Sequence, residues 1–153
     1  MDNRKKDEFF MLQALALAEL AQKENEVPIG AVVVLNDEII GQGYNCPIKN
    51  CDPCAHAEII ALKDAAKNIN NYRLLDVTLY TTLEPCIMCA GAIVHARIKK
   101  LVFAAKDEKA GAIISRAQIL DLPYLNHKIL YEYGVLQNRS SDLLKNFFQT
   151  KRK

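Results

Sequence analysis

Two short segments carry residues that can hold one zinc ion, and any fold of this chain must bring them together. The first is segment 56–58 (His-Ala-Glu), and the second is segment 85–89 (Pro-Cys-Ile-Met-Cys). Cys86 and Cys89 are three positions apart, which places both sulfur atoms on one face of a helix. With the imidazole of His56 they make three ligands, the number that leaves the fourth position of a catalytic zinc open to water. The two segments therefore predict one Zn²⁺ per chain.

The same segments predict how this site works. Pro85 suits the first turn of a helix, and the N-terminus of that helix favours the thiolate form of a cysteine. Glu58 is not needed as a ligand, so we expect it to shuttle protons to and from the activated water. His56 and Glu58 are two positions apart and cannot share a face of a regular helix. His56 must therefore precede a helix, with Glu58 in its first turn.

A helix and a hairpin are predicted for the first third of the chain. Apolar residues recur at helical spacing near the N-terminus, and Asn25 provides a C-terminal stop. A β-branched run at 30–35, a turn at Asn36-Asp37 and a second strand at 38–43 indicate a hairpin. The residues that form the apolar stripe of this covering helix are Phe9, Leu12, Ala16 and Leu20.

The remainder of the chain alternates between helices and strands. Proline, asparagine and aspartate residues mark 45–54 as a loop. The order strand, helix, strand over 77–105 implies a parallel crossover. We expect a single domain over residues 1–153, of the α/β class, with three layers (α/β/α) and a mixed five-stranded sheet. The expected helices are 55–68, 85–96 and 140–151 and the expected strands 77–82, 100–105 and 128–133, with apolar positions Ile59, Ile60 and Leu62 in the first of these helices and a stripe of Leu143, Leu144, Phe147 and Phe148 in the last.

Composition favours a reducing compartment. The chain has 153 residues, half of them hydrophobic, and its net charge of +2 does not by itself imply a nucleic-acid partner. Five cysteines are an odd count that disfavours a secreted disulfide framework, so we expect a cytoplasmic protein. Basic residues at 4–6 before an apolar run imitate a signal peptide, but acidic residues at 7, 8 and 19 argue against one. No segment is long and apolar enough to span a membrane.

A second set of cysteines offers a different zinc site. The Cys-x-x-Cys pairs at 51–54 and 86–89 together spell a four-cysteine structural module, which binds zinc but does not catalyse. The two pairs are further apart than in a usual zinc ribbon. This alternative also gives no role to His56 or Glu58, whereas the catalytic hypothesis uses both.

The two zinc segments match the signature of zinc-dependent nucleobase deaminases, His-x-Glu followed by Pro-Cys-x-x-Cys. Over nearly its whole length, from segment 26–32 (Glu-Val-Pro-Ile-Gly-Ala-Val) to Phe147-Phe148, the chain resembles bacterial tRNA-specific adenosine deaminases, which are cytidine/deoxycytidylate deaminase-like proteins. The resemblance implies their fold, a homodimer, and deamination of adenosine to inosine at the wobble position of a tRNA anticodon stem-loop. Cysteines at 46, 51 and 54 depart from the family, where these positions are not usually all cysteine.

The resemblance also implies contacts with the target nucleotide. In the family, an asparagine at the position of Asn45 approaches this nucleotide, as does backbone near Ala57. The loop 106–111 resembles the segment beside the flipped nucleotide, which makes Asp107 a candidate contact. Ordinary turn chemistry explains an asparagine before a turn equally well, and a solvated charged loop explains 106–111.

The C-terminal tail is a candidate RNA contact. Residues 145–153 include four basic side chains and no acidic one. Basic groups such as Arg152 can neutralise phosphates, and an aromatic ring such as that of Phe148 offers a stacking surface. Positive charge also suits the C-terminal end of a helix without any ligand, so composition leaves both explanations open.

The expected reaction uses Glu58 twice. It takes a proton from the activated water and delivers it to N1 of the adenine, while C6 is attacked and ammonia leaves. One alternative is the same machinery acting on a free base, nucleoside or nucleotide, such as guanine or a cytosine compound. Free-cytidine enzymes commonly have cysteine where this chain has His56, which lowers that option. The alternative from another class is the structural zinc module.

Overall fold

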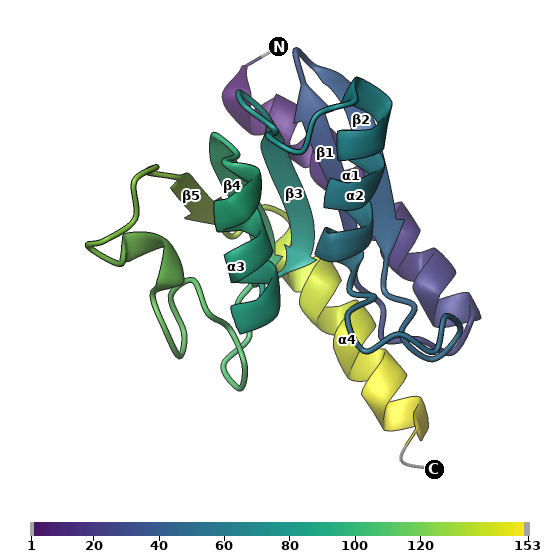
Figure 1. Cartoon of the computed structure of the whole chain (residues 1–153). Coiled ribbons are helices and arrows are strands. Elements are labelled where there is room, and N and C mark those ends of the chain that lie inside the picture. Colours follow the sequence, from purple (N-terminus) through teal and green to yellow (C-terminus); the bar gives the residue numbers. More distant parts are fainter. Residues whose placement is uncertain (1, 152–153) are drawn as a thin grey trace.

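A five-stranded sheet with helices on both faces forms the body of the protein (Figure 1). The computed structural model describes residues 2–151. Helices α1 and α4 cover one face of the sheet, and α2 and α3 cover the other, so the predicted three-layer α/β/α fold is confirmed. The elements in chain order are α1 (Asn3–Lys23), β1 (Gly30–Leu35), β2 (Glu38–Tyr44), α2 (Ala57–Ile69), β3 (Thr78–Leu83), α3 (Ile87–Ala96), β4 (Lys100–Ala105), the short 3-10 helix η1 (Ile119–Asp121), β5 (Leu130–Tyr133) and α4 (Gln137–Lys151).

The sheet is mixed, with strand order β2-β1-β3-β4-β5. β1 pairs antiparallel with β2 and β3, whereas β3 and β4, and β4 and β5, pair in parallel. The predicted parallel crossover through α3 is therefore confirmed. Tyr44 pairs with the first residue of β1, and Leu83 pairs with Ala105, so β2, β3 and β4 end at one edge. The carboxyl ends of parallel strands are where open α/β sheets bind ligands.

Most predicted element boundaries are within a few residues of those observed. The turn at Asn36 and Asp37 has positive φ at both residues, 50° and 64°, as hairpin turns that match strand twist require. α2 begins two residues later than predicted, at Ala57. α4 begins three residues earlier than predicted, at Gln137.

The first helix buries a different face from the predicted one. The predicted stripe of Phe9, Leu12, Ala16 and Leu20 is exposed. The buried apolar side chains are Phe10, Met11, Ala14, Leu15, Ala18 and Ala21. Apolar residues lie on both sides of α1, so spacing alone cannot choose the face that packs. The strand β1 approaches α1 so closely that a Cβ at Gly30 would lie 2.1 Å from the carbonyl oxygen of Ala14. The face of α1 with the small residues Ala14 and Ala18 is therefore the one that packs on the sheet.

Close approach also selects the inner face of α2. Leu62 is buried, but Ile59 and Ile60 are only half-buried. β2 passes so near the helix that a Cβ at Gly43 would lie 2.5 Å from the carbonyl oxygen of Ala57. Small side chains must therefore face the strand, and the larger isoleucines lie beside this contact. The alanines buried on α2 are Ala57, Ala61 and Ala65.

The predicted apolar stripe of α4 is only partly correct. Phe147 is buried, whereas Phe148 is 45% exposed. Neighbouring residues on a helix point about 100° apart, so the two rings cannot both face the sheet. Leu143 and Leu144 are half-buried. Phe148 is therefore available to a ligand on the outer surface.

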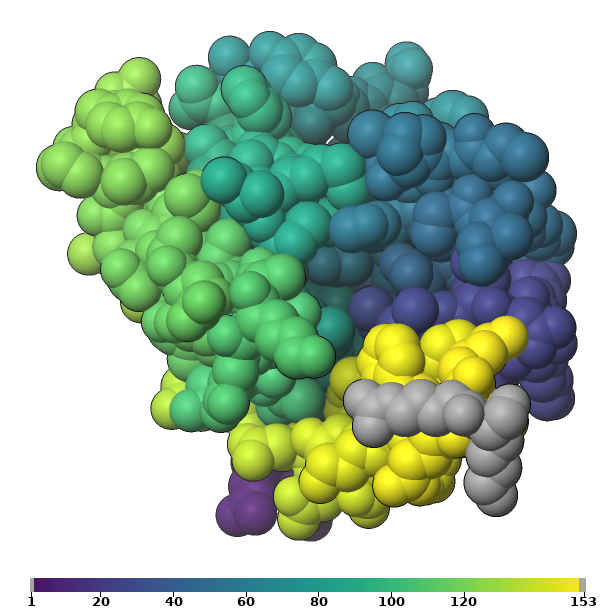
Figure 2. Space-filling model, turned by 90° about the horizontal axis from the view of Figure 1, so that it is seen from below, coloured from purple at the N-terminus to yellow at the C-terminus, as the bar shows by residue number. Residues whose placement is uncertain are grey.

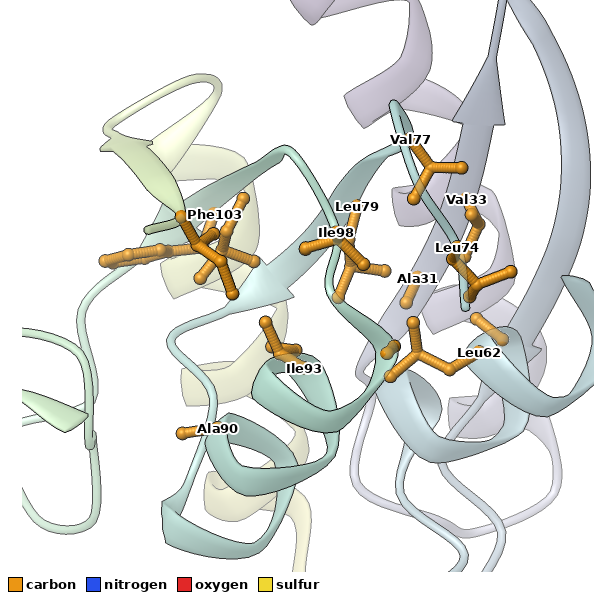
Figure 3. Packing of buried hydrophobic residues seen from close by; sticks show 14 of the residues in the cluster. Ala31, Val33, Leu62, Leu74, Val77, Leu79, Ala90, Ile93, Ile98 and Phe103 are labelled. Carbon is orange, nitrogen blue, oxygen red and sulfur yellow. The ribbon is translucent and has the colours of Figure 1, made fainter. Parts of the chain in front are cut away.

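The larger core lies between the sheet and helices α2 and α3 (Figure 3). Leu79 and Phe103 project from the central strands, and Ile93 of α3 and Leu62 of α2 pack against that face. This packing fixes both helices on the sheet with their N-termini at the carboxyl edge. Among residues 2–151, no helix has the length and apolarity needed to cross a membrane.

Candidate metal centre and active site

The N-termini of α2 and α3 each present a residue of the predicted zinc site. His56 is the N-cap of α2 and Cys86 is the N-cap of α3, both with extended backbone conformation. Neither side chain caps its own helix, so both can point to a shared ligand. The prediction that Pro85 occupies the first turn of α3 is wrong, because the helix begins at Ile87 and the proline precedes the cap.

The three side chains predicted to bind zinc lie within reach of one ion. Nδ1 of His56 is 3.5 Å from Sγ of Cys86 and 3.6 Å from Sγ of Cys89. The ligand atoms all lie within 4.8 Å of one another. Around a tetrahedral zinc with Zn–S and Zn–N bonds of about 2.3 and 2.1 Å, nitrogen and sulfur are about 3.6 Å apart. The side chains therefore fit zinc as they stand, with one tetrahedral position left to a ligand from outside this group.

Glu58 lies in the first turn of α2, and its side chain is buried (4% exposed). His56 precedes the helix, which is the placement that the two-residue spacing requires. Burial raises the pKa of Glu58 to about 7, and the nearby Cys86 thiolate adds to the rise. A cation held beside it favours the carboxylate. Glu58 can therefore reach both protonation states near neutral pH, as a proton shuttle must.

The two cysteines form an unequal pair. The hydrogen bond from the Cys89 thiol lowers the pKa of Cys86 to about 5, with help from backbone N–H groups at the start of α3 and from His56. The same hydrogen bond, together with burial, raises the pKa of Cys89. Cys86 is thus a thiolate at neutral pH, and zinc binding must displace the proton of Cys89, because the thiolate is the metal ligand.

The remaining cysteines lie outside this site. Cys51 and Cys54 are exposed, and the group of metal-ligating side chains found in residues 2–151 does not include them. The alternative four-cysteine zinc module is therefore contradicted by the structure. Cys46 is buried, and burial raises the pKa of its thiol, which keeps it protonated and poorly reactive.

Asn45 and Ala57, the two candidate substrate contacts at the α2 N-terminus, bind each other. The Ala57 N–H donates a hydrogen bond to Oδ1 of Asn45 at 3.3 Å. Asn45 thus serves α2 as a cap in place of His56, whose ring faces the thiols. The side chain of Asn45 is buried (6% exposed), so its position at the strand end is firmly held. A contact from Asn45 to a nucleotide would use its amide NH₂ group.

Three segments border a hollow at the carboxyl edge of the sheet: loop 45–54 (blue), the segment after β4 (green) and α4 (yellow) (Figure 2). Asp107, in the segment after β4, is half-buried, and its Oδ1 accepts the N–H groups of Lys109 and Ala110 at 3.1 and 3.2 Å. This is turn chemistry, and it engages one oxygen of Asp107. Phe148 of α4 is exposed. Arg152 lies outside the described residues.

Two buried carboxylates hold the rim of this hollow, that is, the loop 45–54 and the segment after β4. Neither carboxylate was predicted to have a role. Glu26 (1% exposed) accepts the N–H groups of Ile48 and Lys49 at 3.3 and 2.8 Å and so holds the loop 45–54. Glu84 (2% exposed) holds the segment after β4 in the same way. Burial alone would raise the pKa of Glu84, but its hydrogen bonds outweigh burial and the pKa lies below its usual value. An acidic residue beside a buried strand was the only sequence signal.

Comparison with known proteins identifies relatives along almost the whole chain. Residues 4–105, which include all three candidate ligands and Glu58, match the family "Cytidine and deoxycytidylate deaminase zinc-binding region". A tRNA-specific adenosine deaminase of Haemophilus influenzae is 54% identical over 147 residues, which are 95% of this chain and 85% of that protein. A tRNA-specific adenosine deaminase of Aquifex aeolicus is 44% identical over 142 residues, 93% of each chain.

Solved structures agree with these sequence relatives. A structure from a study of A-to-I editing by tRNA:A34 deaminases at the wobble position of transfer RNA superposes with a TM-score of 0.86 and 39% identity. It covers 89% of this chain and 99% of that one. A guanine deaminase from Nitrosomonas europaea superposes with a TM-score of 0.79 over 92% of this chain and 83% of its own, but at 24% identity it shares the fold alone.

Proposed function

This chain belongs to the cytidine and deoxycytidylate deaminase family, and we propose that it is a zinc-dependent hydrolase that converts adenosine to inosine at the wobble position of a tRNA anticodon loop. The observation that carries the chemistry is a buried Glu58 beside three side chains that fit zinc. The choice of substrate rests on the relatives that match nearly the whole chain and are tRNA-specific adenosine deaminases.

The residues of the site divide the work. His56, Cys86 and Cys89 would hold the zinc ion, which would supply an activated water at neutral pH. Glu58 would accept a proton from the attacking water and donate it to N1 of adenine while the oxygen bonds to C6. The second water proton then passes to the amino group, and the C6–N bond breaks to release ammonia. The buried position of Glu58 keeps this proton from bulk solvent. The N-termini of α2 and α3 point at the site and favour the negative charge that the ligands and the nucleophile carry.

The rim supplies the proposed contacts with RNA. Asn45, directly after β2, and Ala57, at the start of α2, are assigned to the target nucleotide, as is Asp107 in the segment after β4. A surface cavity of about 310 Å³ lies between the segment after β4 and α4, and it is lined by Lys109, Leu144, Lys145, Phe148 and Gln149. Two cations beside an exposed ring suit a phosphate backbone and an unstacked base. This cavity supports an RNA substrate.

An assay of inosine formation tests the proposed function. The purified zinc protein is expected to convert adenosine in an anticodon stem-loop, with much weaker turnover of free adenosine, cytidine and guanine. A loop base can be splayed into a pocket at little unstacking cost, and the flanking nucleotides add binding that a free nucleoside lacks. If the protein turned over free adenosine as efficiently as the stem-loop, the proposal would be replaced by a small-molecule deaminase. Turnover of guanine would favour the alternative of a guanine deaminase.

Two substitutions separate charge from stacking on the RNA surface. Lys145→Ala should weaken stem-loop binding and flatten its dependence on salt, because each neutralised phosphate adds close to one unit to the slope. Phe148→Ala should weaken binding by about 1–3 kcal/mol with little change in the slope, because stacking releases no counterions. Both side chains are exposed, so the fold should be unaffected. Binding isotherms at several salt concentrations measure both effects, and equal slopes for the two variants would contradict the assignment.

We also propose a cytoplasmic homodimer. Its support is an apolar surface groove between α2 and α3, lined chiefly by Ile59, Leu62, Ala66, Tyr72, Leu74 and Ala92. Tyr72 at its border is 70% exposed in the isolated chain. An exposed apolar groove is a suitable place for contact between two subunits, because the contact would remove its apolar side chains from water. Sedimentation equilibrium of the purified protein tests the pairing, and a monomer at micromolar concentration would exclude it.

A further inference from the structure

Glu84 has a buried carboxylate that accepts five hydrogen bonds from one segment, residues 107–115. Oε1 accepts the Asp107 N–H at 3.0 Å and the Ser115 hydroxyl, and Oε2 accepts the N–H groups of residues 113–115 at 3.1, 2.8 and 3.0 Å. The donors come from both ends of the segment. One carboxylate therefore closes it into a loop of fixed shape, and charge-assisted hydrogen bonds of this type are the stronger kind.

The segment also wraps directly over the carboxylate. A Cβ at Gly111 would lie 2.2 Å from Cδ of Glu84 and 2.4 and 2.5 Å from its two oxygens. Any side chain at position 111 would push the loop away from Glu84. The Gly111 N–H donates to the Asp107 carbonyl oxygen at 2.8 Å, which holds the glycine over the carboxylate. The contact is thus shaped by both partners.

The same segment is joined to the part of the chain that carries the metal ligands. The Ala112 N–H donates to the carbonyl oxygen of Pro85 at 2.8 Å. Pro85 stands between Glu84 and Cys86, the N-cap of α3. The backbone N–H of Glu84 itself donates to the carbonyl oxygen of Ala105, the last residue of β4, at 2.8 Å. Segment 107–115 and residues 84–86, which lead into α3, are therefore joined by backbone hydrogen bonds as one unit.

From this geometry we propose that Glu84 is a positioning residue: it holds segment 107–115 as a preformed wall of the substrate site at a fixed distance from the zinc ligands. The segment forms the green border of the hollow in Figure 2, opposite loop 45–54. A wall that needs no ordering when RNA binds improves affinity, because the entropy of ordering is lost before the encounter. The kinetic part of this inference rests on the proposed function.

Glu84→Gln tests the proposal with almost no change in volume. Glutamine can keep its oxygen on the N–H groups of residues 113–115, but its NH₂ group then faces the Asp107 N–H, donor against donor. The variant should release the Asp107 end of the loop and leave the other end in place. Zinc content should stay at one per chain, because the three ligands are unchanged.

Two readouts follow the loop. Lys106 and Lys109 are exposed in it, so limited trypsin digestion should cut Glu84→Gln there roughly tenfold faster than the wild type, as loss of about one strong hydrogen bond predicts. The KM for the stem-loop should rise by about tenfold with kcat changed much less, since the wall binds RNA and does not touch the reacting atoms. If Glu84→Gln is cut at these lysines at the wild-type rate and its KM is unchanged, the proposal is overturned.

A matched control separates positioning from general stability. Tyr80→Phe removes the buried hydrogen bond from the Tyr80 hydroxyl to Asp7, 2.7 Å long, on the opposite face of the sheet. It should lower the melting temperature without changing either readout. If Tyr80→Phe raises the KM and the cutting rate as much as Glu84→Gln, the effect is general destabilisation and the proposal fails.

A milder variant covers the case in which Glu84→Gln does not fold. Ser115→Ala removes one of the five donors, so its cutting rate and its KM should rise less than those of Glu84→Gln. A cutting rate and a KM equal to those of the wild type would overturn the proposal. A wild-type protein that does not act on the stem-loop would defeat the proposed function. The digestion comparison, which needs no activity, would still decide whether Glu84 holds the loop.

Discussion

Glu58→Ala is expected to keep one zinc per chain and the wild-type fold while losing roughly a hundred- to ten-thousand-fold in turnover of the stem-loop, the usual contribution of a general acid–base group. Glu58 is not one of the three side chains grouped around the metal position, so its removal leaves coordination intact. The chemistry loses both proton transfers, from the water and to N1. Single-turnover rates with saturating protein measure the loss, and metal analysis and circular dichroism measure zinc and fold.

Two further variants define the role of Glu58. Glu58→Gln keeps the shape of the side chain but cannot carry the proton, and it should be nearly as inactive as the alanine variant. Glu19→Ala removes an exposed acid from α1 and should be fully active. Turnover by Glu58→Ala within a fewfold of the wild type would remove this residue from the mechanism. Loss of zinc from Glu58→Ala would instead make it a ligand.

Cys86→Ala and Cys89→Ala are expected to purify with little or no zinc and without measurable deamination. Either change leaves two of three protein ligands, which is too few for the catalytic arrangement. Zinc binds the folded protein, so its loss also removes the stability that binding provides, and the melting temperature should fall. Elemental analysis and thermal unfolding, with and without a chelator, measure these effects. Wild-type protein treated with the chelator should melt as the variants do.

Cys51→Ser and Cys54→Ser are the matched controls. Both thiols are exposed and lie apart from the group formed by His56, Cys86 and Cys89, so both variants should keep full zinc occupancy and activity. The substitution by serine removes a thiol that is not a metal ligand, so it should leave zinc binding unchanged. A zinc-free Cys51→Ser or Cys54→Ser protein would restore the four-cysteine site and contradict the ligand assignment.

Local patterns in the sequence were sufficient to predict most of the helices and strands, and to select the three side chains that the structure groups at a possible metal position. The turn at Asn36 and Asp37 and the strand at 100–105 were predicted where they occur, because turn chemistry and a short buried apolar run act over a few residues. The spacing of His56 and Glu58 correctly required a break before α2. These signals depend only on neighbours in the chain.

Other features were decided by contacts that neighbours cannot encode. The helix α1 has apolar residues on both sides, and it buries Ala14 and Ala18 because Gly30 of a different element must lie against it. The stripe with Phe9 and Leu12 has the same spacing and remains exposed. Periodicity reports that a helix has an apolar face, but the shape of the sheet selects which face packs.

The sequence by itself determined the chemistry of this protein: nitrogen and sulfur ligands for zinc, and an acid close to them. The tertiary structure alone decided how the site is held. His56 and Cys86, the two N-caps, lie close together because α2 and α3 begin at the same edge of the sheet. Glu84 acquired its function through hydrogen bonds to residues 23 to 31 positions away, and no local pattern records such partners. Short-range preferences choose the groups, and long-range packing sets the distances at which they act.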